Sequence, residues 1–385
     1  MVNDYQLLRI PGPTPIPPTV QQAMMKTMIG HRDQETKELL QRIQPGLKSI
    51  FGTKEEVVTL AGSGTAGLEA AVVNTVSPED EVLVVVTGSF GDRFAKICEA
   101  YHLQVKRVEY EWGKALIPDE IKTYLTNNPS IKAVFATYCE TSTGVLNPIQ
   151  QLTKAVKEVS DALVIVDGVS CVGAVETKLD EWQIDVCVTG SQKALMLPPG
   201  LVFIAASKKA WNIIEKNYQP RFYLDLRKYR SSIQQDSTPF TPALSLLFGL
   251  EQSLQLLHSE GLETVYQRHQ LMKDMTRAAF RALDIPLLTN DQDASPTVTA
   301  IKPDDFKADV LRKKLKQDFG LVLAGGQNHL KGNIFRIGHM GYCTPADVLQ
   351  TISCIELGLQ QIGKQINLGD GVKAAQVTYL QEGSS

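Results

Sequence analysis

The sequence predicts an α/β fold, with a large domain built on a mainly parallel, seven-stranded type of sheet and a smaller α+β C-terminal domain. Short apolar runs rich in valine and isoleucine alternate with amphipathic stretches through most of the chain. This pattern is typical of parallel strands that helices cover on both faces. After Pro242 long helical patterns replace the alternation, which indicates a second unit.

The predicted strands of the large domain are short and mostly apolar. They lie at Val57–Ala61, Val82–Thr87, Val105–Glu109, Ala133–Tyr138, Leu163–Asp167, Val186–Thr189 and Val202–Ala206. Helices are expected between most of them, for example at Leu68–Val76 and Gln151–Val159. Because strands and helices alternate along the chain, we expect most neighbouring strands to run parallel.

The C-terminal part is predicted to hold more helix than strand. The expected elements are helices at Ala243–Ser259, Glu263–Leu283 and Lys307–Asp318, and strands at Pro296–Ile301 and Asn333–Ile337. A last helix is expected to begin with Thr344 as N-cap, Pro345 in the first turn and Asp347 three residues after the cap. The structure of the tail after Gln365 stays open, because its apolar periodicity is weak.

A chain of 385 residues is longer than one hydrophobic core usually supports. We therefore predict an extended, proline-rich arm without regular structure over residues 1–20, a large domain over residues 21–264 and a small domain over residues 265–385.

Composition excludes several classes of partner. The net charge is -3 and there is no run of lysine or arginine, so the sequence lacks the clustered positive charge that is typical of nucleic-acid-binding proteins. No apolar stretch is long enough for a membrane span, and the first residues lack a signal-peptide layout, so a cytoplasmic protein is expected. The cysteines are scattered without a C-x-x-C pair, which favours free thiols and argues against a metal site.

A glycine-rich turn follows the first predicted strand. Gly62, Gly64 and Gly67 have the G-x-G-x-x-G spacing, and glycines at the start of a helix let its free N–H groups approach an anion. Three interpretations stay open: a phosphate monoester, a dinucleotide, or a tight turn without a ligand. The next strand ends in Thr87 and Gly88, without the acidic residue that a dinucleotide ribose needs, so the dinucleotide is the weakest.

An acid and a lysine follow two later strands. Asp167 ends one predicted strand and Lys193 comes shortly after another, and α/β sheets place their ligands at such strand ends. Alone, the aspartate would be taken for a helix cap and the lysine for a solvated charge. Together they fit pyridoxal 5′-phosphate (PLP) chemistry, in which a lysine amine forms a Schiff base and a carboxylate keeps the ring nitrogen protonated.

Eight segments together resemble the class V, fold-type I aminotransferases, and most closely the alanine–glyoxylate/serine–pyruvate aminotransferase group. They follow the order of that family and cover the chain from about residue 8 to residue 342. The segments are IPGPTPIPP, AGSGTAGLEAAVVN, TGSFGDR, ETSTGV, VDGVSCVGA, TGSQKAL, TPFTPA and FRIGHMG. The resemblance implies the fold-type I PLP-transferase fold, with residues 21–264 as the PLP-binding domain.

By this resemblance Lys193 is the Schiff-base lysine and catalytic residue, and Asp167 the partner of the pyridine nitrogen. The remaining cofactor-binding residues fall into three groups. Ser63, Gly64 and Thr65 form a phosphate cup, and Gln192 adds a donor beside the lysine. Phe90 stacks on the pyridine ring. Ser142 supplies a hydroxyl near the ring or the substrate. Thr141 is an open alternative to Ser142, and plain core packing is the alternative for Phe90.

Two further assignments concern the partner subunit and the substrate. Thr238 and Thr241 resemble residues that reach the phosphate from the neighbouring subunit, which implies a homodimer with shared active sites; a helix cap is the alternative for Thr241. Arg336 is expected to bind the substrate α-carboxylate through two parallel bonds, and Gly12 to line the same pocket.

The expected reaction is transamination between a small amino acid and a small 2-oxo acid. Alanine–glyoxylate aminotransfer is favoured, with serine–glyoxylate or serine–pyruvate aminotransfer as the alternative, because one arginine and no second evident cation suit short substrates. A cysteine desulfurase is disfavoured, since the late loop Leu323–Lys331 lacks a cysteine. A non-catalytic, hydrogenase-associated subunit is also disfavoured.

Overall fold

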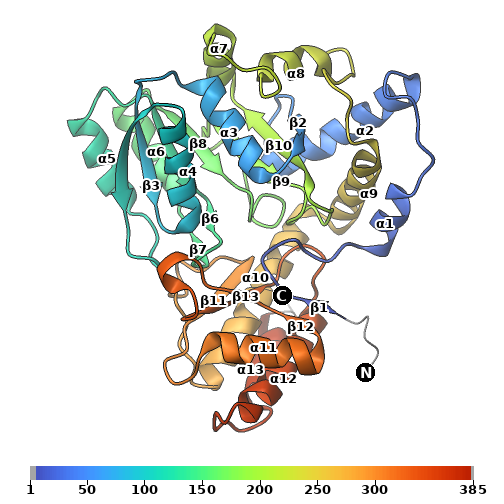
Figure 1. The fold of residues 1–385 in the computed structure, drawn as a ribbon, viewed down its shortest axis with the longest axis vertical. Coiled ribbons are helices and arrows are strands. Elements are labelled where there is room, and N and C mark those ends of the chain that lie inside the picture. Colours follow the sequence, from blue (N-terminus) through green and yellow to red (C-terminus); the bar gives the residue numbers. More distant parts are fainter. Residues whose placement is uncertain (1–5, 383–385) are drawn as a thin grey trace.

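The computed structural model describes residues 6–382, in which a large α/β unit lies above a smaller α+β unit (Figure 1). The large unit is built on one sheet of seven strands in the order β2-β10-β9-β8-β5-β3-β4. These strands are β2 (Val58–Gly62), β3 (Glu81–Val86), β4 (Gln104–Glu109), β5 (Ala133–Thr137), β8 (Leu163–Asp167), β9 (Val186–Gly190) and β10 (Gly200–Ala206). All seven predicted strands are confirmed, with ends within two residues of the prediction.

The pairing is parallel from β9 through β8, β5 and β3 to β4. Strand β10 is antiparallel to both β9 and β2, so β2 again points the same way as β9. The mainly parallel sheet predicted from the alternation of strands and helices is therefore correct. Every residue of β5, β8 and β9 is buried, as expected for strands covered on both faces.

Two hydrophobic clusters lie on the two faces of this sheet. Leu83 and Val85 of β3 belong to one cluster and Val82, Val84 and Val86 to the other, because successive strand residues point to opposite faces. The covering helices are α2 (Gln34–Phe51), α5 (Pro118–Asn127), α6 (Ile149–Val159) and α9 (Leu244–Glu260) on the first face, and α3 (Gly64–Thr75), α4 (Ser89–Ala100), α7 (Lys208–Lys216) and α8 (Leu226–Ile233) on the second.

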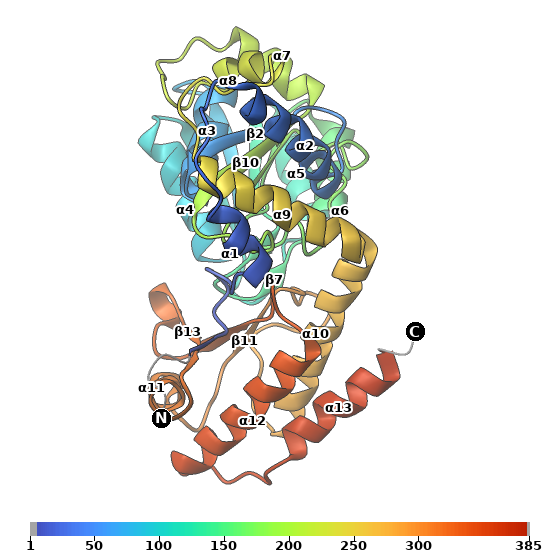
Figure 2. The ribbon, with the colours of Figure 1, turned by 90° about the vertical axis from the view of Figure 1, so that its right-hand side faces the viewer.

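The smaller unit packs helices against a three-stranded sheet in the order β11-β14-β13, formed by Val298–Ile301, Phe335–Gly338 and Ala324–Gly325. Its helices are α10 (Leu262–Ala282), α11 (Ala308–Phe319), α12 (Pro345–Gln361) and α13 (Asp370–Glu382), and a short 3-10 helix covers Asn328–Leu330. Figure 2 shows α9 and α10 leading from the large unit into the small one. Thr344 caps α12 with a capping box to Asp347, as predicted.

Two expectations about chain ends need correction. The helix after Thr344 is not the last one, because α13 follows it and packs on α10. The arm is also not free of regular structure: β1 (Leu7–Leu8) pairs in parallel with β12 (Leu321–Val322), and α1 (Pro18–Met24) begins inside the predicted arm. Residues 1–5 of the arm lie outside the described residues.

The arm therefore joins the two units. The Gly338 N–H donates to the Arg9 carbonyl at 2.8 Å in the small unit, and a few residues later the arm reaches the large unit, where the Thr14 N–H donates to the Gln192 carbonyl at 3.1 Å. The division into residues 1–20, 21–264 and 265–385 stays our proposal. In the described part of the chain, no helix combines the length and apolarity that a bilayer crossing requires.

Candidate active site

The predicted site residues follow parallel strands that point in one direction. Ser63 follows β2, Phe90 follows β3, Asp167 ends β8 and Lys193 follows β9. Because strands that run in one direction end on the same edge of a sheet, their carboxyl ends bring these four positions to one edge, where α/β proteins bind ligands.

Lys193 is buried and held by the N-terminal arm. Its Nζ donates a hydrogen bond to the Pro11 carbonyl at 2.9 Å, and its own carbonyl accepts one from the Thr14 hydroxyl at 2.9 Å. Burial lowers the pKa of the Lys193 amine to about 8, with the Arg336 and Arg93 charges adding to the decrease and Cys139 and Asp167 opposing it. A sizeable fraction of the amine is therefore neutral near physiological pH and able to act as a nucleophile or base.

Asp167 lies in register with Val188 of the strand that leads to Lys193. The side chain of Asp167 is 4% exposed, and its Oδ1 accepts a hydrogen bond from the Val169 N–H at 2.9 Å. Burial raises the pKa of the Asp167 carboxyl to about 6, and the nearby Glu140 charge adds to this, while Lys193 and Arg93 lower it. Such a carboxylate is stabilised further by any cation that binds beside it.

The glycine-rich turn is the beginning of α3, with Ser63 as N-cap and Gly64 as first helical residue. The Ser63 side chain makes no capping hydrogen bond. A Cβ on Gly64 would stand 2.9 Å from a methyl carbon of Val169, so only glycine lets this turn approach the Asp167 loop. Ser63 and Thr65 are exposed, and the first N–H groups of the helix provide donors for an anion.

Arg93 borders the same turn, and Gln192 directly precedes Lys193. The Gln192 Oε1 is buried and has no hydrogen-bond partner among the described residues. Arg93 lies over the ring of Phe90, with its guanidinium carbon 4.7 Å from the ring centroid, and its Nη1 reaches the Thr65 hydroxyl at 3.5 Å. Sequence reasoning did not single out Arg93, because an exposed arginine in the first turns of a helix carries no special signal.

A buried carboxylate that sequence reasoning missed connects Phe90 to the loop that follows β6 (Cys139–Glu140). Glu140 is fully buried and accepts hydrogen bonds from the Phe90 and Gly91 N–H groups at 3.1 and 3.0 Å. It also accepts from the Ser142 N–H and hydroxyl. Only the segment ETSTGV pointed to this region, and the resemblance carried no role for its glutamate.

The hydroxyl of Ser142 has protein partners on both sides. It donates to Glu140 and accepts the Ser89 N–H at 2.9 Å. Thr141 instead bonds through its hydroxyl to Ser170, and its carbonyl accepts from Arg336 at 2.8 Å. Both hydroxyls therefore have protein partners, and the choice between Ser142 and Thr141 stays a prediction.

Arg336 and Gly12 lie on the small-unit side of the site. Arg336 is 6% exposed, and its guanidinium donates to the carbonyls of Thr141 and of Gly325, the latter from both Nε at 3.0 Å and Nη2 at 2.7 Å. No carboxylate pairs with this guanidinium within residues 6–382. Burial lowers the pKa of Arg336 to about 10, partly offset by the Glu140 charge. Gly12, with φ +139°, packs on Lys193, and a Cβ there would meet the lysine Cδ at 2.6 Å.

Among the described residues, neither Thr238 nor Thr241 makes a hydrogen bond to Lys193. They line a surface pocket with Tyr229 and Phe240, and the Thr238 hydroxyl donates to the Phe240 carbonyl at 2.8 Å. The interpretation of Thr241 as a helix cap is wrong, because α9 begins at Leu244 with Ala243 as N-cap.

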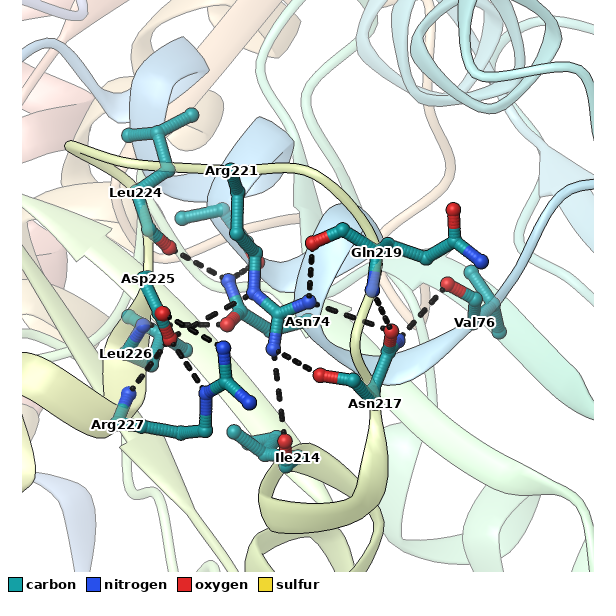
Figure 3. A network of polar contacts seen from close by, with 11 residues as sticks. Asn74, Val76, Ile214, Asn217, Gln219, Arg221, Leu224, Asp225, Leu226 and Arg227 are labelled. Atoms are coloured by element: carbon teal, nitrogen blue, oxygen red, sulfur yellow. Dashed lines mark hydrogen bonds and ion pairs between the residues drawn. The ribbon is translucent and has the colours of Figure 1, made fainter.

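The surface segment 217–226, which leads into α8, is fixed by a polar network (Figure 3). Arg221 donates to the Asn217 and Gln219 carbonyls at 2.7 and 3.0 Å. Asn74 of α3 donates to the Leu224 carbonyl at 2.6 Å and accepts the Leu226 N–H at 3.1 Å. This network ties the segment to the same helix whose first turn forms the glycine-rich cup, and holds the exposed rings of Tyr218 and Phe222 on the surface.

Comparison with known proteins shows which family the chain belongs to. The class-V aminotransferase family matches residues 7–348. The chain is 44% identical to the small subunit of a soluble hydrogenase from Synechococcus sp. over 97% of this chain and 98% of that one. It is 35% identical to an L-aspartate–glyoxylate aminotransferase from Paracoccus denitrificans (97% and 96% covered) and 36% identical to a serine–glyoxylate aminotransferase from Methylorubrum extorquens (97% and 96%). The crystal structure of pyridoxamine–pyruvate aminotransferase from Mesorhizobium loti superposes with a TM-score of 0.94 at 27% identity, covering 99% of each chain.

The fold and the site thus define an aminotransferase, and the chain belongs to the class-V aminotransferase family. Its cofactor is PLP, and its substrates are amino and oxo acids, as expected from the sequence. The residues present fit this cofactor: a buried lysine of lowered pKa stands beside a buried carboxylate, and a helix N-terminus with a close-approach glycine faces the same edge.

Proposed function

We propose that this enzyme transfers an amino group between alanine or serine and glyoxylate or pyruvate, with alanine and glyoxylate as the preferred pair. The observation that carries the proposal is Arg336, a buried guanidinium without a carboxylate partner among the described residues. A buried cation of this kind is stabilised by binding an anion, and the guanidinium fork matches a substrate carboxylate.

Bound PLP supplies an electron sink that stabilises the substrate Cα when it loses its proton. Asp167 pairs with the ring nitrogen and keeps it protonated, and its buried position makes this charge pair strong. The start of α3 with Ser63, Gly64, Thr65 and the neighbouring Gln192 binds the phosphate. Phe90 covers one face of the ring.

Lys193 both holds the cofactor and moves the proton. Burial lowers the pKa of its amine to about 8. The amine takes the proton from the Cα of the amino donor and, in the reverse half-reaction, gives a proton to the corresponding carbon of the oxo acid. Arg336 fixes the substrate carboxylate in orientation, and Gly12 leaves room for the lysine side chain to move. We assign the hydroxyl near the ring or the substrate to Thr141 in preference to Ser142, because the Thr141 carbonyl also contacts Arg336.

The preference for short substrates follows from the placement of the charges. Arg336 already anchors the α-carboxylate, and Arg93 stands over Phe90 beside the phosphate cup, a position that suits the cofactor phosphate rather than a second substrate carboxylate. Arg312 is a second cation whose charge acts on Arg336, but it already pairs with Asp309 and donates to the Leu323 carbonyl, which disfavours it as the anchor of a distal carboxylate.

The test is a matrix of amino donors against glyoxylate and pyruvate with the purified enzyme. We expect the highest kcat/KM for alanine, then serine, with glyoxylate as acceptor. Aspartate and glutamate are the matched dicarboxylic donors, and a higher kcat/KM for either would refute the short-substrate proposal. Sulfide release from cysteine as the main activity would refute transamination itself.

The active enzyme is proposed to be a homodimer in which Thr238 and Thr241 reach the phosphate in the partner subunit. Thr238 and Thr241 lie in a surface pocket that Tyr223 also lines, and the segment 217–226 that carries Tyr223 is anchored by the network of Arg221 and Asn74. The exposed aromatic side chains of Tyr218 and Phe222 beside it suit burial against a second copy.

A further inference from the structure

One buried carboxylate has no role in the reaction proposed above. Glu140 is fully buried, and no lysine or arginine pairs with it among the described residues. Instead its two oxygens accept the Phe90, Gly91 and Ser142 N–H groups and the Ser142 hydroxyl. A buried charge held only by neutral donors is costly unless every bond is made, so its position is tightly specified.

The carboxylate lies at the N-terminus of α4, where the helix dipole favours a negative charge. The approach is close enough to require glycine next to it, because a Cβ on Gly88 would stand 2.5 Å from the Glu140 Cγ and Cδ. The first turn of α4, which carries Phe90, is thereby fastened to the loop after β6.

The same loop also contacts Arg336, the proposed anchor of the substrate carboxylate. Thr141 follows Glu140 directly, and its carbonyl accepts the Arg336 guanidinium at 2.8 Å. The Glu140 carboxylate therefore fixes the position of Phe90 and also that of the loop to which Arg336 donates a hydrogen bond. Its charge also acts on the chemistry, because it raises the pKa of Arg336 and of Asp167.

We propose that Glu140 is a positioning residue of the amino-transfer site, which aligns the Phe90 ring with the Arg336 anchor and supplies a buried negative charge to both Asp167 and Arg336. This inference rests on the roles proposed above for Asp167, Phe90 and Arg336. Glu140 touches neither cofactor nor substrate and acts only through these residues.

The test compares Glu140→Gln with Glu356→Gln. Glu356 is a matched control, because it is 3% exposed and likewise accepts backbone N–H groups at a helix start, those of Gly369, Gly371 and Val372, but in the small unit. Three quantities are measured for each variant. They are the dissociation constant of PLP, the pH midpoint of the bound cofactor's visible absorbance, and kcat and KM with alanine.

For Glu140→Gln we expect weaker PLP binding and a kcat/KM about tenfold or more below wild type, because sub-ångström misplacement of positioning groups is costly. We also expect a lower pH midpoint, because loss of a negative charge disfavours the protonated form of nearby groups. Glu356→Gln should match wild type in all three. An unchanged midpoint and PLP affinity in Glu140→Gln, or equal changes in Glu356→Gln, would overturn the proposal.

Two milder variants keep the test decisive if Glu140→Gln does not fold. Glu140→Asp keeps the charge and should keep the pH midpoint, while Ser142→Ala removes one donor and should weaken PLP binding without moving the midpoint. Wild-type PLP affinity in both would also overturn the proposal. If wild-type protein itself carries no cofactor on Lys193, the proposed site fails, and that outcome is distinct from the failure of Glu140 alone.

Discussion

The amine of Lys193 donates a hydrogen bond to the backbone carbonyl of Pro11, 182 residues away in the chain, at 2.9 Å. The same arm is paired to the small unit through β1 and β12. Lys193 of the large unit, the proposed catalytic lysine, is therefore connected to the small unit, which carries Arg336, by one short stretch of chain.

Gly12→Ala should damage this junction. The added Cβ would lie 2.6 to 2.8 Å from Lys193 Cδ, Cε and Nζ, so the lysine must leave its position. We expect kcat/KM to fall about 100-fold, the scale of a misplaced catalytic group. Gly363→Ala is the matched control, because Gly363 also has a positive φ (+91°) but a Cβ there meets nothing within 4 Å. Equal losses of activity in both variants would show that backbone strain alone is responsible.

Arg336→Lys should separate charge from geometry. Lysine keeps the positive charge but cannot form two parallel bonds to a carboxylate, and it cannot bond Gly325 and Thr141 in the same way. Loss of one charged hydrogen bond corresponds to about 1.5–3 kcal/mol, so KM for alanine should rise about tenfold or more. PLP affinity should stay close to wild type. Steady-state kinetics at several alanine concentrations checks this, and an unchanged KM would contradict the anchor role.

Two buried histidines should make stability depend on pH. Burial lowers the pKa of His269 to about 3 and that of His339 to about 4, and the His269 Nε2 accepts the Gly341 N–H at 3.1 Å. Both folded pKa values lie below the unfolded value of about 6.5, so the unfolded chain binds more protons between these limits. Stability is therefore fully present above pH 6.5 and falls towards pH 4, by about 1.4 kcal/mol per pH unit for each histidine.

Urea unfolding between pH 4 and pH 8 measures this slope. His269→Gln retains a side-chain acceptor for Gly341 but does not titrate, so its profile should be shallower than that of wild type. A profile as steep as that of wild type would exclude His269 as a source of the pH dependence.

Mixing two impaired variants tests the shared site, because Thr241→Ala should weaken PLP retention and Lys193→Ala should remove the Schiff-base amine. If Thr241 serves the partner's phosphate, a dimer of one Thr241→Ala chain and one Lys193→Ala chain holds one complete site, which takes Lys193 from the first chain and Thr241 from the second. Activity should then reappear when the two variants are unfolded together and refolded. Each variant refolded alone is the control. No gain in the mixture, despite detected heterodimers, would place Thr241 outside the partner's site.

The sequence was sufficient for most of the fold and for the residues at strand ends. Valine-rich runs mark strands covered on both faces, and because parallel strands end together, Asp167 and Lys193 could be expected on one edge. The helix α13 was missed, since only Gly371 and Ala375 of it are buried and it shows little apolar periodicity. The strand at Leu7–Leu8 was missed because two residues form no pattern, and their partner lies at Leu321–Val322.

The contacts that position the site were beyond sequence reasoning for another reason. Glu140 bonds backbone groups at Phe90 and Gly91, about 50 positions away, and backbone N–H groups leave no mark in a sequence. The partners of the adjacent Thr141 and Ser142 hydroxyls, Ser170 and Glu140, likewise depend on side-chain direction, which a sequence does not show.

The most direct test of the account is to reduce the purified, PLP-loaded enzyme with borohydride and to map the modified peptide by mass spectrometry. The account predicts one pyridoxyl adduct, on Lys193, and none in Lys193→Ala treated in parallel. An adduct on another lysine of the wild-type protein, or a protein that takes up no PLP at all, would contradict it.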